Sequence, residues 1–78
     1  MMRAKFKIDS ITFTTYSEQL KFSAVCKKTS YPADGSDEDN TYAKFTPTAD
    51  LAMTITNPDL QGKFKPGQVF YVDFTPAE

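Results

Sequence analysis

The sequence predicts an all-β fold, namely a small five-stranded antiparallel barrel or sandwich, with an SH3-like barrel favoured. Apolar and polar residues alternate with the period of a strand in most segments, and turn residues separate these segments at short intervals. No segment of useful length has the periodicity of a helix. We treat residues 1–78 as a single β-rich domain, because a chain of 78 residues has room for one small core.

The first predicted strand is long and bent. In AKFKIDSITFT, Phe6 and Ile8 share one parity. Ile11 and Phe13 take the other parity. Because successive side chains of a strand point to opposite faces, the change at Asp9–Ser10 requires a bulge or a change of face.

The second predicted strand, LKFSAVCK, is the most regular. It places four apolar or small residues on one face, Leu20, Phe22, Ala24 and Cys26. A catalytic thiol needs an accessible, electropositive setting, which this face does not offer. We therefore expect Cys26 to be a buried, small apolar residue.

Three more strands and one helical turn complete the expected fold. A third strand is expected over Thr41–Thr46, a fourth in DLAMTIT, and the last in QVFYVDFT after a type II turn at Pro66–Gly67. NPDLQG predicts a single helical turn before the last strand, with Asn57 as its N-cap and Gly62 at its end. This position of the helical turn is typical of SH3-like barrels and fits an OB-fold less well.

Charge is distributed unevenly along the chain. The formal net charge is −1, but four of the 10 acidic residues lie in SYPADGSDEDN, residues 30–40. The rest of the chain has six acidic residues against nine basic ones and is therefore basic. Because residues 30–40 are polar and contain Pro and Gly, we expect a flexible acidic loop, a solvated connector whose four acids can be replaced with little effect on folding.

The composition also excludes several kinds of chemistry. The chain has no histidine, which removes the commonest general base near neutral pH and the commonest transition-metal ligand. Its three glycines form no phosphate-binding loop, and its single cysteine cannot build a zinc site. The acidic loop departs from a calcium loop, because Gly35 directly follows Asp34 and no Glu closes it. We predict a protein that is not an enzyme and holds no metal or cofactor.

A cytoplasmic location is expected from three absences. No apolar run approaches the length of a membrane span, and MMRAKFKIDS lacks the apolar region of a signal peptide. One cysteine cannot form the internal disulfides that are common in small secreted domains.

The second half of the chain resembles a group of viral proteins. The run from TPTADLAMTITN through FKPGQVFYVDFTPAE is similar to small, largely uncharacterised accessory proteins of tailed bacteriophages and prophages. This resemblance implies the cytoplasm of a bacterial host as the place of action and an accessory role in infection. It implies no active site.

Two sets of residues are candidates for binding. An exposed acidic surface can steer or imitate charge for a basic partner, so the partner-binding candidates are Tyr31, Asp34, Asp37, Glu38 and Asp39. Basic residues beside aromatic rings hold single-stranded nucleic acid on small barrels, so the candidates for that role are Arg3, Lys5, Lys7, Tyr42 and Tyr71. The opposing interpretation of the basic row is the solvated outer face of an edge strand.

The leading hypothesis is a non-enzymatic phage-type binding module that docks on a host or phage protein, for example in counter-defence. One alternative is a small barrel that binds single-stranded nucleic acid or a nucleotide. Another is a minor structural or assembly protein of the virion. No membrane partner is expected, and a homo-oligomer is left open because strand edges of small barrels often self-associate.

Overall fold

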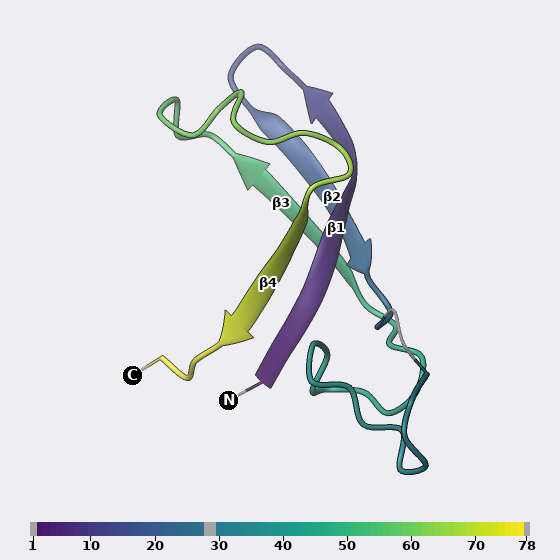
Figure 1. Cartoon of the computed structure of the whole chain (residues 1–78). Coiled ribbons are helices and arrows are strands. Elements are labelled where there is room, and N and C mark those ends of the chain that lie inside the picture. The colour runs from purple at the N-terminus through teal and green to yellow at the C-terminus, as the bar shows by residue number, and fades with distance from the viewer. Residues whose placement is uncertain (1, 28–29, 78) are drawn as a thin grey trace.

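The computed structural model describes residues 2–27 and 30–77, and within them it contains four strands and no helix. They are β1 (Met2–Phe13), β2 (Glu18–Ala24), β3 (Asp50–Ile55) and β4 (Val69–Phe74). All of them belong to one antiparallel sheet in the order β3-β2-β1-β4, which is the spatial order of a Greek key (Figure 1). The prediction of an all-β fold is confirmed, whereas the five strands of a closed barrel are not found in these residues.

The bend in β1 lies where the change of parity predicts it. Ile8 is opposite Phe22 and Ser10 is opposite Lys21, so the register between β1 and β2 shifts across Asp9. This bulge returns Ile11 to the face that carries Ile8 and packs it against the core. Of the two alternatives that the sequence leaves open at Asp9–Ser10, a bulge or a change of face, the structure contains the bulge.

The expected strand at Thr41–Thr46 does not form, because the chain pairs with β1 only briefly. Thr41 N donates to the Arg3 carbonyl oxygen at 2.9 Å. The next contact along β1 comes from a side chain, since Lys5 N donates to Asn40 Oδ1 at 2.9 Å. Ala43 N then donates to the Asn40 carbonyl oxygen at 3.0 Å, which turns the chain away from β1. The described residues between β2 and β3, 25–27 and 30–49, therefore contain no strand, and we call them the β2–β3 loop.

The expected helical turn at residues 57–62 is a series of hydrogen-bonded turns. Asn57 does act as its cap, since its Oδ1 accepts from Asp59 N at 3.0 Å. Its carbonyl oxygen accepts from Leu60 N, also at 3.0 Å. The segment stops after this because Gly62, with φ at 78°, leaves helical geometry. The expected turn at Pro66–Gly67 forms, with Gln68 N donating to the Lys65 carbonyl oxygen at 3.2 Å.

One face of the sheet, which we call the inner face, carries the hydrophobic core. Its buried residues are Ala4, Phe6, Ile8, Leu20, Phe22 and Ile55. The connection from β3 to β4 runs from one edge of the sheet to the other and packs Phe64 against this core. The connection is fixed to the sheet at Glu18, a buried carboxylate whose Oε1 accepts a hydrogen bond from Gly62 N.

The sheet curls into half a barrel that does not close (Figure 1). β3 and β4 are its two edge strands, and they do not pair with each other. The molecule measures 48 × 32 × 15 Å. Its shortest dimension is therefore only slightly greater than the thickness of one sheet with its side chains. Within the described ranges no helix is long and apolar enough to cross a membrane.

Two expectations from the sequence are wrong, because long-range contacts determine where a strand ends and which strands are neighbours. Cys26 is exposed, since β2 ends at Ala24 and the alternation is not continued by a strand. Arg3, Lys5 and Lys7 do not lie on an edge strand, because β1 is a central strand between β2 and β4.

Candidate functional site

The outer face of the sheet carries an ion pair between β1 and β4. Arg3 lies opposite Asp73 in the register, and its Nε and Nη2 donate to the two carboxylate oxygens at 2.7 and 3.2 Å. Its guanidinium also lies over the Tyr71 ring, 4.8 Å from the centroid. The hydrogen bond raises the pKa of Arg3, and the same bond lowers the pKa of the Asp73 carboxyl. Because the pair is exposed, its contribution to stability is small.

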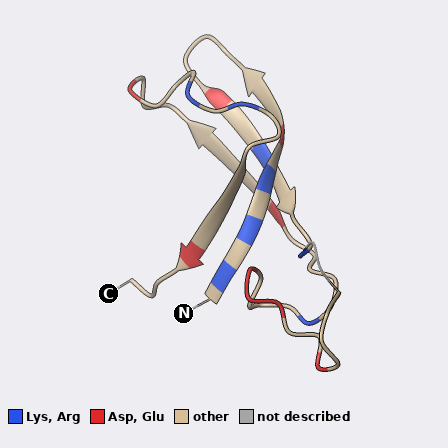
Figure 2. Cartoon of the chain, in the orientation of Figure 1, with Lys and Arg blue, Asp and Glu red and all other residues tan. Residues whose placement is uncertain are grey.

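Lys5 joins this group to the acidic loop. Its Nζ lies 3.5 Å from Asp39 Oδ2, and the Tyr71 hydroxyl donates to Asp39 Oδ1 at 2.9 Å. Lys5 and Tyr71 face each other across β1 and β4, so one carboxylate from the loop contacts both strands. Residues that represent two different candidate sites in the sequence thus form one cluster of opposite charges. Figure 2 shows the basic positions along β1 between acidic positions of β4 and of the loop.

Asp37 has a structural role, which corrects the expectation of a solvated connector. Its side chain is only 3 % exposed. Its Oδ1 accepts from Asp39 N at 2.9 Å, and its Oδ2 accepts from Asn40 Nδ2 at 3.2 Å. The Tyr31 hydroxyl lies 3.4 Å from the same Oδ2. Asp37 therefore holds the loop together and is not available as a charge for a partner.

The other two acids of the loop are exposed. Asp34 accepts from Ser36 N at 3.0 Å, and this hydrogen bond lowers the pKa of its carboxyl. Glu38 receives a hydrogen bond from Lys27 Nζ at 3.1 Å, and the pKa of Glu38 is also lowered, chiefly by its own backbone N–H. Of the acidic candidates, only these two present a carboxylate largely to solvent.

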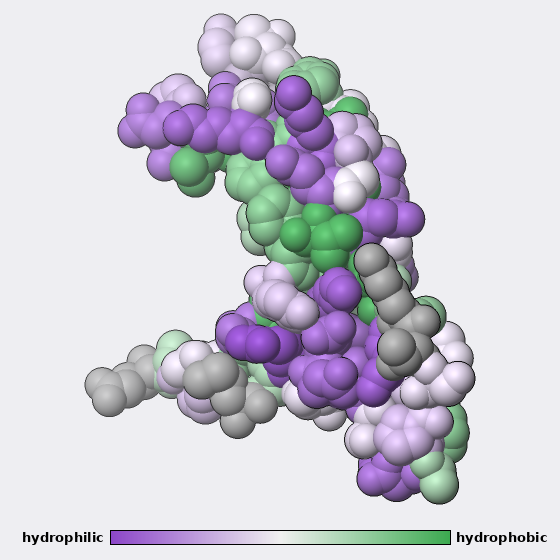
Figure 3. All heavy atoms as spheres, viewed as in Figure 1, coloured by the Kyte–Doolittle hydropathy of each residue, from purple (hydrophilic) through white to green (hydrophobic). Residues whose placement is uncertain are grey.

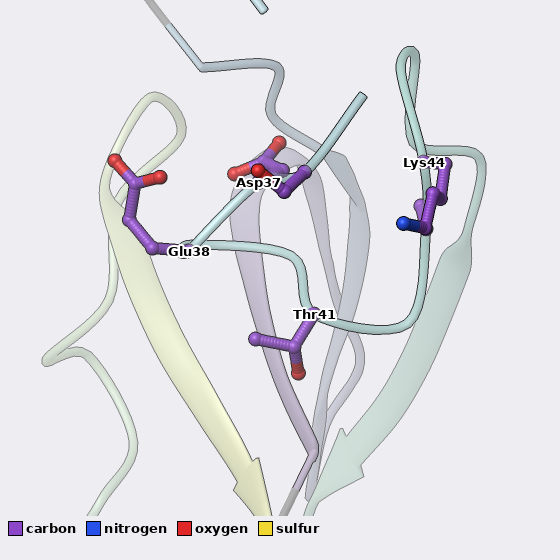
Figure 4. Close-up of a pocket in the computed structure, with 6 residues that line it drawn as sticks. Asp37, Glu38, Thr41 and Lys44 are labelled. Carbon is purple, nitrogen blue, oxygen red and sulfur yellow. The ribbon is translucent and has the colours of Figure 1, made fainter. Parts of the chain in front are cut away.

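A shallow hollow of about 330 Å³ lies within the β2–β3 loop (Figure 4). Lys44 and Thr41 line it together with Asp37 and Glu38, and in the close-up these four side chains do not converge on one point. Its most buried carboxylate, that of Asp37, is already occupied by hydrogen bonds of the loop itself. Among the described residues no group of three or more potential ligands is placed to hold a metal ion.

The candidates for nucleic-acid binding do not form one surface. Arg3 and Lys5 are already paired with carboxylates, whereas Lys7 has no ion pair among the described residues. Tyr71 lies with them on the outer face. Tyr42 packs against the core on the opposite face, where burial raises the pKa of its hydroxyl. The aromatic and basic residues that a single strand would need are thus divided between the two faces.

Sequence reasoning missed the most unusual surface, the edges of the inner face. Four large apolar side chains of the inner face are substantially exposed: Met53 of β3 at 47 %, Phe74 of β4 at 46 %, and Phe13 and Met2 near the two ends of β1 at 67 % and 40 %. Met2 and Phe74 also line an apolar cavity of about 130 Å³ that reaches Tyr42. Figure 3 shows hydrophobic residues in the hollow of the crescent-shaped molecule. Alternation in DLAMTIT and QVFYVDFT indicated one apolar face per strand, but not that both strands are edges.

Comparison with known proteins places this chain in no family. No family model matches it, and neither a curated protein nor a solved structure is significantly similar to it.

Tyr71 makes the outer cluster sensitive to alkaline pH. Its hydrogen bond to Asp39 favours the neutral phenol and raises the pKa of Tyr71 above its ordinary value of 10.0. A group with a raised pKa contributes stability below its unfolded pKa and loses it as the pH rises through the folded one. We therefore expect the free energy of unfolding to fall above about pH 10, and to fall less steeply in Tyr71→Phe.

Urea denaturation at a series of pH values measures this slope for the wild type and the variant. Tyr16→Phe, which removes the hydroxyl of a ring that is 82 % exposed, is the control. An equal slope in the wild type and Tyr71→Phe would show that the hydrogen bond to Asp39 does not persist in solution.

Proposed function

We propose that this protein is a non-enzymatic protein-binding module that docks through the inner face and the two edge strands of its open sheet. One observation carries the proposal: the chain forms a single curled sheet whose apolar face is incompletely covered at both edges. A sheet that is apolar on one face needs a second layer, and large apolar side chains left exposed on that face are typical of a protein-interaction site.

The edge strands support this function because they lack the usual protection against pairing. Natural edges are blunted by charged residues, proline or bulges. β3 contains one charged residue, Asp50 at its first position, and β4 contains only Asp73. Neither strand contains a lysine or a proline. Both edges are therefore open to a partner strand, with apolar side chains beside them to fill the interface.

The acidic loop is a weaker docking surface than the sequence suggested. Asp37 is buried, and Asp39 is engaged by Lys5 and Tyr71. Asp34 and Glu38 leave two exposed carboxylates, too few for the charge complementarity that directs binding to a basic partner. The resemblance to accessory phage proteins supports action inside a bacterial host, on a host or phage protein.

The function is tested by affinity capture under conditions that compare the two faces of one strand. The tagged wild type, Met53→Lys and Thr54→Gln are incubated with bacterial lysate and with the same chain carrying a second tag. Met53 and Thr54 are neighbours on β3, but only Met53 lies on the inner face. We expect the wild type and Thr54→Gln to retain a protein partner that Met53→Lys loses, because a buried unpaired ammonium opposes docking, whereas a neutral residue on the outer face does not.

A joint replacement of Asp34 and Glu38 by Ser separates this proposal from docking through the acidic loop. Loss of the partner in that variant, together with its retention by Met53→Lys, would move the binding surface to the loop and contradict the proposal. Far-UV circular dichroism confirms that each variant is folded.

A further inference from the structure

The surface of the chain is too large for a monomer of its mass. Its accessible area is 5622 Å² for 8.8 kDa. A compact monomer of this mass exposes about 4,800 Å², so the excess is roughly 800 Å². The radius of gyration is 14.5 Å, against about 11.5 Å for a compact domain of this length. One partner in a standard protein–protein interface buries about 800 Å², so the excess equals one side of such an interface.

The two edges are complementary to each other. β3 and β4 both have six residues, and each has three apolar residues on the inner face. β3 runs in the direction of β1, whereas β4 runs against it, because every neighbouring pair in the sheet is antiparallel. A two-fold axis along the axis of the curled sheet brings β4 of one copy beside β3 of another in antiparallel orientation.

One register of this pairing keeps all apolar side chains inside. Met53 of one copy is then opposite Val72 of the other, with the pairs Leu51–Phe74 and Ile55–Phe70 on either side. On the outer face, Ala52 is opposite Asp73. No two like charges meet, because each strand has one charged residue and Asp50 falls beyond the end of β4.

We infer that the partner of the open face is a second copy of this chain, and that two half-barrels join β3 to β4 at both edges to close an eight-stranded antiparallel barrel. Eight strands enclose an interior that side chains can fill, which suits two apolar inner faces. Closure also removes both open edges at once. This inference rests on the proposed function, since it names the partner for the same surface.

Light scattering coupled to gel filtration tests the inference on the purified chain alone. We expect the wild type and Thr54→Gln to have twice the 8.8 kDa mass of one chain, and Met53→Lys to be a folded monomer whose dimer dissociation constant is raised about 100-fold or more. A wild type that is monomeric at every concentration overturns the inference. So does a Met53→Lys variant that dimerises as tightly as the wild type.

Disulfide trapping tests the register with variants that leave the core intact. In a Cys26→Ser background, Ala52→Cys and Asp73→Cys are mixed under mild oxidation. Directly opposed residues have Cα atoms about 4.5–5.5 Å apart, within disulfide range. We expect the mixture to form a cross-linked dimer. Lys21→Cys is the matched control, since Lys21 is opposite Ala52 but one strand further from the edge.

The results distinguish the inference from the proposed function. If Ala52→Cys links only to itself, β3 pairs with β3, and the closed barrel is wrong. If the wild type is monomeric but captures a bacterial protein in a manner that depends on Met53, the partner is not a second copy of this chain. The proposed function is then retained and the inference is wrong. A monomer without any such capture contradicts both.

Discussion

Replacing Asn40 by Ala is expected to lower the free energy of unfolding by about 3 kcal/mol. Asn40 is 0 % exposed, yet it lies in a polar loop. Its Oδ1 accepts from Lys5 N at 2.9 Å, and its Nδ2 donates to the Val25 carbonyl oxygen, also at 2.9 Å. The Asn40 side chain thus makes the hydrogen bonds that a paired strand would otherwise make to the part of β1 that β2 does not reach.

The size of this effect follows from the groups that the mutation leaves without partners. Lys5 N–H and the Val25 carbonyl belong to the backbone, so they cannot be removed together with the amide of Asn40. An unsatisfied buried donor or acceptor costs about 1–3 kcal/mol, and since the two groups here are only partly buried, we expect about 3 kcal/mol for both together. Since a chain of this size has a total stability near the low end of the range for domains, about 5 kcal/mol, most of it would be lost.

Urea denaturation of the wild type and Asn40→Ala measures the difference. Asp34→Ala is the matched control in the same loop, because the Asp34 carboxylate is exposed and its hydrogen bond to Ser36 N is local. It is expected to change stability by less than about 0.5 kcal/mol. If both variants were equally stable, residues 30–40 would be the solvated connector that their composition suggests.

The fold could be predicted from the sequence where local patterns decide it. The change of parity between Phe6–Ile8 and Ile11–Phe13 predicts a bulge or a change of face in β1, and the bulge is the alternative that keeps Ile11 against the core. The same alternation predicts the strands that became β2, β3 and β4. It does not predict where β2 ends, so the buried position that alternation predicts for Cys26 is wrong. Strand order, and therefore which strands are edges, depends on long-range pairing that alternation does not encode.

The site was harder to predict because its contacts join distant parts of the chain. Lys5 and Asp39 are separated by 34 positions, and Arg3 and Asp73 by 70. Each partner of these pairs looked like a free charge in the sequence. The composition of SYPADGSDEDN correctly predicted a loop, but polar residues also form buried hydrogen-bond networks when backbone groups nearby need partners. Asp37 and Asn40 have that role, and no local pattern separates them from Asp34 and Glu38.

Replacing Gly35 by Ala is expected to cost about 2–3 kcal/mol, because both the backbone and the space around it oppose a side chain. Gly35 has φ at 74°, where a residue with a Cβ is strained. A Cβ there would lie 2.5 Å from Cδ2 and Cε2 of Phe45. Phe45 is held in place by its N–H, which donates to the Gly35 carbonyl oxygen at 2.7 Å, and by its ring, whose centroid lies 6.1 Å from that of Tyr31. Urea denaturation of the wild type and Gly35→Ala measures the cost.

Gly62 separates the two causes of this cost. Its φ of 78° is nearly the same, but nothing lies within 4 Å of the position of its Cβ. Gly62→Ala is therefore expected to cost only the backbone part, about 1 kcal/mol. In a Phe45→Ala background, the stability cost of Gly35→Ala should fall to the same value, since the ring that the added Cβ would contact is absent. If Gly35→Ala costs no more than Gly62→Ala in the wild-type background, Phe45 does not pack against Gly35 in solution. The contact of Tyr31 with Phe45 would then not order this part of the β2–β3 loop.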